Sequence, residues 1–140
     1  MVNYFLDTCI WRDFYERRIG SGGRNLGSAA AKLFLKILKK KDKILFSEAL
    51  LWELNKDYSA SEINDMLNLL YTANSLIKIE IGKEEFILAK TMSLKRNIPF
   101  IDALNALQAK NHNAIMVSQD MHYLKDLKDI VTTKRPEELI

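Results

Sequence analysis

The sequence predicts an α/β protein in which a central, mostly parallel sheet of about five strands is covered by helices on both faces. The first observation is that strand-like and helix-like patterns alternate along the 140 residues, with no internal repeat and no linker. The second is the continuously apolar run near residues 114–118, which is typical of a strand buried on both faces. At this length, and with 48% hydrophobic residues, we expect one domain over residues 1–140.

The first half of the chain contains two predicted strands, each followed by helices. Tyr4, Phe5 and Leu6 have strand character, Asp7 ends that run, and residues 43–46 form the second strand. Ser47 can cap the helix that follows. We expect helices at residues 10–18 and 26–40, from residue 48 to about residue 56, and after a capping box formed by Ser59 and Glu62.

The second half continues the alternation. Pro99 closes a connection, because a proline biases the preceding residue away from helix. Asp102 is expected to open the next helix, and Asp120 directly follows the apolar strand. We expect strands at residues 75–81, 114–118 and 130–131, and helices at residues 83–96, from 102 to about 110, and at 121–127.

Composition excludes several classes of protein. With Cys9 as its one cysteine, the chain cannot form an internal disulfide or a zinc site made of thiolates alone, and Cys9 is expected to be a small buried residue. The glycine-rich loop at residues 20–23 is not followed by Gly-Lys-Ser/Thr, so it is not a P-loop. No apolar run approaches the ~18 residues of a membrane span, and no signal peptide is recognisable. A cytoplasmic protein without membrane contact is expected, and the net charge of +3 permits a polyanionic partner.

Three acids are predicted to meet at one edge of the sheet. Asp7 and Asp120 end strands, and Asp102 starts a helix. Helices in βαβ units run antiparallel to the strands, so helix N-termini and strand C-termini share the edge where ligands bind. Glu53 lies roughly 9 Å along its helix from Ser47, at about 1.5 Å per residue, and reaches the site if that helix crosses it. Glu48 is nearer the strand end and remains open as the fourth acid.

Each of these acids alone could be a helix N-cap, but the set indicates a metal site. Clustered carboxylates repel one another unless a cation neutralises them, so without metal at least one carboxyl pKa is expected to be raised. A hard divalent ion with oxygen ligands supplies that neutralisation.

The ordered set of motifs resembles the PIN domain family, and in particular its VapC-like ribonuclease toxins. The resemblance extends over almost the whole chain. Its motifs are Tyr4-Phe5-Leu6-Asp7-Thr8, Phe46-Ser47 running to Glu53-Leu54, Ile98-Pro99-Phe100-Ile101-Asp102-Ala103-Leu104, and Val117-Ser118-Gln119-Asp120. It implies a three-layer α/β/α fold in which the first strand lies between the second and the fourth. Two departures from the family pattern are the longer glycine-rich loop and Gln119, which replaces a basic residue often found there.

The resemblance also implies an activity and a set of site residues. The activity is hydrolysis of RNA by a Mg²⁺- or Mn²⁺-dependent endoribonuclease. The metal-site and catalytic acids would be Asp7, Glu53, Asp102 and Asp120, with Glu53 favoured over Glu48; Thr8, Ser47 and Ser118 would be hydroxyls near the metal or phosphate, and Asn105 would orient water or touch RNA.

A protein partner is a further expectation from this resemblance. Many small PIN proteins are toxins of the VapBC type, held inactive by an antitoxin, and PIN proteins often form homodimers. Trp11, Phe14 and Tyr15 recur at helical spacing and share one face, which is either part of the core or a contact surface for the antitoxin.

Other functions remain open on the sequence. A catalytically silent PIN-like module that binds RNA or protein is the main alternative. A haloacid-dehalogenase-like phosphatase would need an acid where Cys9 lies, and a receiver domain would need one where Leu6 lies. His112 and His122 are expected to be solvated turn residues, so a histidine nuclease is not favoured.

Overall fold

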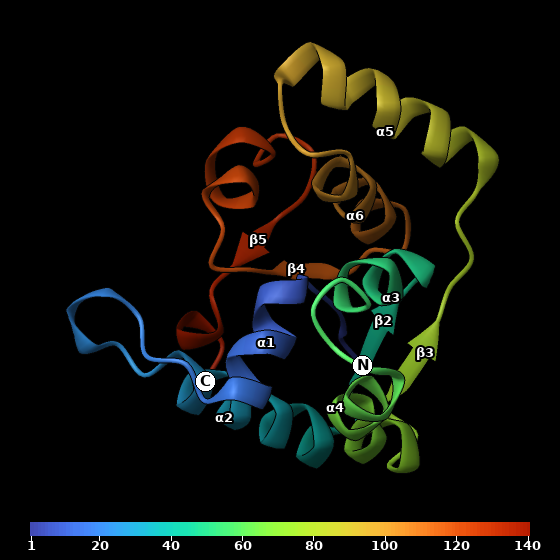
Figure 1. Cartoon of the computed structure of the whole chain (residues 1–140). Helices are drawn as coiled ribbons and strands as arrows, with labels where there is room; N and C mark the ends of the chain where they lie inside the picture. Colours follow the sequence, from blue (N-terminus) through green and yellow to red (C-terminus); the bar gives the residue numbers. More distant parts are fainter.

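A five-stranded sheet, entirely parallel, forms the centre of the computed structural model, which describes residues 1–140 (Figure 1). Its strands are β1 (Asn3–Leu6), β2 (Lys43–Phe46), β3 (Leu76–Lys78), β4 (Ile115–Val117) and β5 (Thr133–Lys134). They are arranged in the order β3-β2-β1-β4-β5, so β1 is central and pairs with β2 on one side and β4 on the other. The predicted fold class and the central position of the first strand are confirmed.

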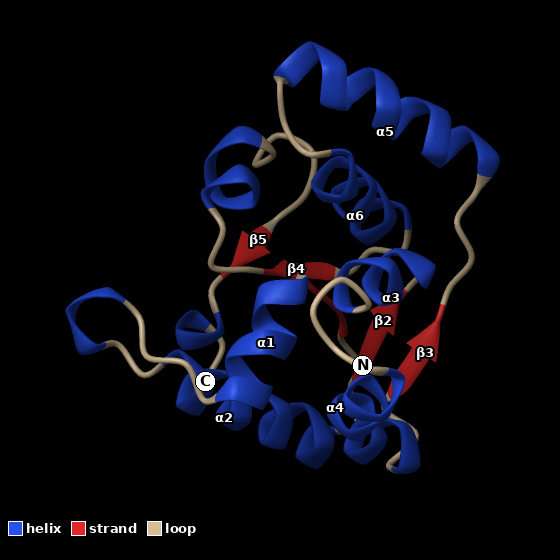
Figure 2. Ribbon diagram, viewed as in Figure 1, coloured by secondary structure: helices blue, strands red, loops and turns tan.

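Helices cover both faces of the sheet (Figure 2). One layer contains α1 (Thr8–Glu16), α2 (Leu26–Lys40), α3 (Glu48–Leu54) and α4 (Ala60–Thr72), and the other contains α5 (Lys83–Arg96), α6 (Phe100–Asn111) and the π-helix η2 (His122–Asp126). Short 3₁₀ turns lie at Ser21–Gly23 (η1) and Pro136–Glu138 (η3). None of the helices combines the length and apolar character needed to cross a bilayer.

Alternation along β1 divides the interior into two cores. Tyr4 and Leu6 belong to the core beneath α1, α2 and α4, while Phe5 belongs to the core beneath α5 and α6. Successive side chains of a strand point to opposite faces, so a short strand of large apolar residues serves both layers at once. This is why the first strand can lie at the centre of the sheet.

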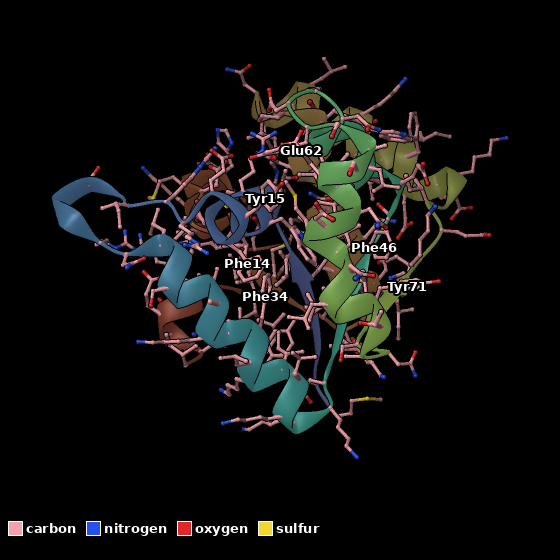
Figure 3. The ribbon with its side chains drawn as sticks, turned by 60° about the horizontal axis from the view of Figure 1, so that its bottom comes forward. Phe14, Tyr15, Phe34, Phe46, Glu62 and Tyr71 are labelled. Carbon is pink, nitrogen blue, oxygen red and sulfur yellow. The ribbon has the colours of Figure 1, made fainter.

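Of the two alternatives for the aromatic face of α1, the structure supports the core for Trp11, while Phe14 and Tyr15 are partly buried. Trp11 is fully buried, with its ring centroid 5.3 Å from that of Phe34 on α2. Phe14 packs edge-on against the same ring at 4.7 Å (Figure 3). Tyr15 packs edge-on against Tyr58. These rings bind α1 to its neighbours, so replacing Trp11 by alanine would cost about 3–5 kcal/mol of stability rather than test binding to a partner.

Several predicted boundaries differ from the structure. The first helix begins at Thr8 and ends at Glu16, rather than spanning residues 10–18. The third strand spans only Leu76–Lys78 instead of residues 75–81, and Ile79 makes one more backbone hydrogen bond to β2, at the Phe46 carbonyl. The last strand lies at Thr133–Lys134 instead of residues 130–131: Val131 is a buried core residue but is outside the ladder with β4.

The helix that carries Asp102 starts earlier than expected. It begins at Phe100 with Pro99 at the N-cap, so Asp102 lies in the first turn instead of opening the helix. The segment after Asp120 is a π-helix over His122–Asp126, not an ordinary helix over residues 121–127. Both differences change which side chains face the carboxyl edge of the sheet.

Candidate functional site

Asp7 lies at the carboxyl end of the central strand and is 7% exposed. It is also the N-cap of α1, and its Oδ1 accepts a hydrogen bond from the Thr8 backbone nitrogen at 2.8 Å. Its Oδ2 accepts from the Ser118 hydroxyl at 2.9 Å and from the Cys9 thiol at 3.3 Å. Capping and site membership are therefore combined in one carboxylate.

Ser118 joins the acids that follow the two neighbouring strands β1 and β4. Its hydroxyl donates to Asp7 and accepts from the backbone nitrogen of Asp120, each at 2.9 Å. Its side chain is fully buried, and the adjacent Val117 carbonyl accepts from the Asp7 backbone nitrogen at 2.9 Å. The register of the β1–β4 pair therefore fixes the position of both carboxylates.

Asp102 reaches the same edge from the first turn of α6 and is 8% exposed. Its two oxygens have separate partners: His122 Nδ1 lies 2.8 Å from Oδ2, and the Tyr123 hydroxyl donates to Oδ1 at 3.3 Å. Consecutive residues of a regular helix point about 100° apart. The π-helical turn that begins at His122 allows both side chains to contact one carboxylate.

Asn105 supports this arrangement through a buried hydrogen bond to Tyr123. It is 4% exposed, and its side-chain amide donates to the Tyr123 hydroxyl at 3.1 Å. Tyr123 is fully buried, so its hydroxyl depends on these two neighbours for hydrogen bonds. Asn105, Tyr123 and Asp102 thus form a buried polar chain that orients the Asp102 carboxylate.

Asp120 completes the cluster. Its Oδ1 accepts from the backbone nitrogen of His122 at 2.8 Å and lies 3.4 Å from Nδ1 of the same residue. One ligand atom from each of Asp102, Asp120 and His122 lies within 4.8 Å of the other two. Carboxylate oxygens and an imidazole nitrogen at this spacing are a set of donors that fits a divalent ion.

The electrostatics of the site are those of crowded carboxylates. Burial and the negative charge of Asp102 raise the pKa of Asp7 to about 7. Burial also raises the pKa of Asp102, and the hydrogen bond to Asp102 raises the pKa of His122. The predicted rise of at least one carboxyl pKa is confirmed, and its main cause at Asp7 is loss of hydration, with charge repulsion second.

Glu53 does not join the cluster through a hydrogen bond. It lies near the end of α3, where its carboxylate pairs with Lys56 at 3.3 Å and its carbonyl oxygen accepts from Arg12. Glu48 lies on the β3 side, where it pairs with Lys78 at 2.5 Å. Asp7, Asp102 and Asp120 influence one another electrostatically, whereas the partners of the two glutamates are lysines outside this cluster.

The remaining predicted hydroxyls lie at the same edge of the sheet. Ser47 is fully buried at the end of β2, and its hydroxyl accepts from the Ala49 backbone nitrogen at 3.3 Å, so it caps α3 as expected. Thr8 is 8% exposed at the start of α1. Neither side chain forms a hydrogen bond with an acid of the cluster.

Three neighbours of the acids were not assigned to the site from the sequence. His122 was expected to be a solvated turn residue, but its ring contacts two carboxylates. Tyr123 and Cys9 each contact an acid as well. One signal in the sequence could have indicated His122. It lies two residues after Asp120, and the side chains of aspartates in turns commonly accept a hydrogen bond from the backbone nitrogen two residues on.

Comparisons with known proteins agree with this fold. The PIN domain family model matches residues 4–129, whereas no curated protein matches the sequence. The structure of VapBC2 from Rickettsia felis bound to a promoter DNA fragment has a TM-score of 0.65 at 19% identity, covering 96% of this chain and 98% of that one. A toxin–antitoxin complex from Klebsiella pneumoniae has a TM-score of 0.64 at 14% identity, and the match covers 95% of this chain and 97% of that one. The structure of PAE2754 from Pyrobaculum aerophilum has a TM-score of 0.61 at 14% identity, and the match covers 99% of this chain and 86% of that one.

Proposed function

The chain belongs to the PIN domain family, and from this premise we propose that it is a divalent-metal-dependent endoribonuclease. The observation that carries the proposal is the convergence of Asp7, Asp102 and Asp120 at the carboxyl edge of the sheet, with ligand atoms of Asp102, Asp120 and His122 within 4.8 Å. Ions that suit carboxylate-rich sites, Mg²⁺ or Mn²⁺, are the proposed cofactors. The chemistry supplied by such a bound ion is Lewis-acid polarisation of a phosphoryl oxygen.

The acids have different proposed roles. Asp102 and Asp120 would hold the ion, because one ligand atom of each lies within 4.8 Å of the other. Asp7 would complete the negative field, and its buried hydrogen bond from Ser118 holds it in place. Ser118 would act as a positioning residue for both strand-end acids, and Asn105, whose amide donates to Tyr123, is proposed to act through that residue.

Glu53 is retained as a fourth proposed acid. Its present partner, Lys56, is 68% exposed, and an exposed ion pair of this kind contributes about 0–1 kcal/mol. Such a pair would not prevent the glutamate from turning toward a cation. Thr8 and Ser47 are proposed to lie beside the scissile phosphate, because both are at the strand-end edge and at the start of helices.

An RNA substrate is supported by basic side chains near this edge. Arg24 donates to Gln119, the residue before Asp120, and is ion-paired with Glu137. Arg12 lies beside the end of α3, where it is paired with Asp57 at 2.8 Å. Exchange of these exposed carboxylate partners for backbone phosphates would place a strand across the acids.

The experiment is cleavage of a mixed, end-labelled RNA pool in Mn²⁺, Mg²⁺ or EDTA. Wild-type protein is expected to cut in either metal and not in EDTA, and Asp102→Asn is expected to lower the rate by at least about 100-fold. Asp65→Asn, the same change at an exposed position on α4, is the matched control. Metal binding without any cutting would instead support a silent module that binds RNA or protein.

An antitoxin is also proposed as a partner, since solved neighbours of the fold include toxin–antitoxin complexes. An apolar hollow of about 230 Å³ between α3, α4 and β3 supports the proposal, and its apolar lining is Phe46, Leu51, Leu67, Tyr71 and Leu76. We expect Tyr71→Ala to weaken binding of a cognate antitoxin, and Leu94→Ala, at an exposed position on α5, to leave that affinity unchanged. If Tyr71→Ala and Leu94→Ala bound the antitoxin with equal affinity, this hollow would not be its binding surface. A homodimer remains a prediction, tested by light scattering.

A further inference from the structure

The ring of His122 lies between two of the proposed metal-holding carboxylates. Nδ1 is 2.8 Å from Asp102 Oδ2 and 3.4 Å from Asp120 Oδ1. The side chain is 39% exposed, so the ring is at the open side of the cluster and accessible from solvent. An imidazole at this point changes the chemistry of a site otherwise made of oxygen donors.

These distances match those between neighbouring ligands of one ion. Two ligand atoms about 2.1 Å from a metal and at right angles to each other lie about 3 Å apart. At the wider angle of tetrahedral coordination the separation rises to about 3.4 Å. Both distances from His122 Nδ1 lie close to these values, and the ligand atoms of Asp102, Asp120 and His122 all lie within 4.8 Å of one another, so small side-chain adjustments would let them share one ion.

The backbone holds His122 in this place. Its own nitrogen donates to Asp120 Oδ1 at 2.8 Å, which ties the start of η2 to the acid. The π-helical turn directs the ring to Asp102, while Tyr123 anchors the same carboxylate from the buried side. A ligand positioned in this way loses little conformational entropy on binding, which favours coordination.

We propose that His122, through Nδ1, is a direct ligand of the ion that Asp102 and Asp120 hold, and that it biases the site toward Mn²⁺ over Mg²⁺. The inference rests on the proposed function for its metal site. Carboxylate and water oxygens suit both Mg²⁺ and Mn²⁺, but Mn²⁺, as a first-row transition metal, accepts an imidazole nitrogen more readily than the harder Mg²⁺ does. Coordination through Nδ1 would require the tautomer that carries its ring proton on Nε2, and any proton held on Nδ1 would be released to solvent.

The first test is pulsed EPR on the Mn²⁺ complex of the full chain, which detects imidazole nitrogen bonded to the ion. Protein made with ¹⁵N-histidine should show the ¹⁵N coupling in place of ¹⁴N. The chain has two histidines, so His112→Asn is the matched control. His112 is on the far end of α6, where its ring contacts the Gln108 carbonyl. The signal should persist in His112→Asn and vanish in His122→Asn.

The second test compares the Mn²⁺ and Mg²⁺ dissociation constants by calorimetry. His122→Asp substitutes an oxygen donor and is expected to lower the Mn²⁺/Mg²⁺ affinity ratio about tenfold or more, within the range that changes around metal sites produce. Thermal melting of each variant monitors folding. Should His122→Asn fail to fold, the labelled wild-type spectrum together with His112→Asn still decides the assignment.

The two proposals fail in different ways. If wild-type protein binds Mn²⁺ but shows no imidazole coupling and an unchanged affinity ratio in His122→Asp, the ligand assignment is overturned and the acid site stands. If wild-type protein binds neither ion at millimolar concentration, the metal site itself is overturned, and the assignment of His122 with it.

Discussion

At the scale of single residues, Asp7 makes stability depend on pH. Burial and repulsion raise its pKa from 3.8 to about 7 in the folded state, so the folded chain binds a proton more tightly than the unfolded chain does. The associated stability is fully present below about pH 4 and is lost as pH rises through 7. In EDTA, urea unfolding of wild type should show this loss, while Asp7→Asn should be more stable than wild type by roughly 2–4 kcal/mol at pH 8. Asp65→Asn should show the same pH dependence of the free energy of unfolding as wild type. If the free energy for Asp7→Asn fell with pH in parallel with wild type, Asp7 would not be the source of the pH dependence.

Ser118 is predicted to set the titration of Asp7. Its hydroxyl donates to the buried carboxylate and so lowers the pKa of Asp7 against the effect of burial. Ser118→Ala should therefore raise the midpoint of the Asp7 ¹³Cγ titration above the wild-type value, as followed by NMR in metal-free protein. Ser61→Ala, at an exposed position, is the control and should leave it unchanged. A lower midpoint in Ser118→Ala would mean that the hydroxyl is not a donor to this carboxylate.

At the scale of elements, Gly27 determines how closely α1 and α2 approach. A Cβ at this position would lie 2.7 Å from the Arg17 Cα and 2.8 Å from the Asp13 carbonyl oxygen, both backbone atoms. Gly27→Ala should therefore destabilise the protein by about 1–3 kcal/mol, measured by thermal or urea unfolding. At Gly82 an added Cβ would meet the flexible Glu85 side chain at 3.2 Å, so Gly82→Ala should cost less. An equal cost at the two positions would mean that the helix contact can relax.

The elements also show what sequence could predict. Strand ends and helix starts fixed the edge at which Asp7, Asp102 and Asp120 meet, because parallel βαβ topology leaves few alternatives. The directions of individual side chains at that edge were not predictable. The direction of the Glu53 side chain depends on how α3 crosses the sheet, and the position of His122 depends on a π-turn that no local pattern signals. Val131 is buried outside the ladder, so burial alone misplaced the last strand.

At the scale of the whole molecule, metal binding should stabilise the fold. An ion that binds the folded chain but not the unfolded one adds about 2.7 kcal/mol at a hundredfold excess over its dissociation constant. The melting temperature should therefore rise with millimolar Mn²⁺ or Mg²⁺ and fall back with EDTA in calorimetry. The rise should disappear in Asp102→Asn and persist in Asp65→Asn. A wild-type melting curve indifferent to both ions would contradict the site.

The pairing of β1 with β4 has a consequence for protein synthesis. The hydrogen bond between Ser118 and Asp7 joins residues 111 positions apart. During synthesis β1 is therefore made long before β4, the strand with which it pairs on this side. Domains form as units during translation, and distant strand pairs form late because closing a long loop costs entropy. A chain interrupted before β4 therefore lacks two of the three clustered contributors to the site. On the proposed function, the ribosome would carry an inert nascent chain until β4 and the residues up to His122 had been added.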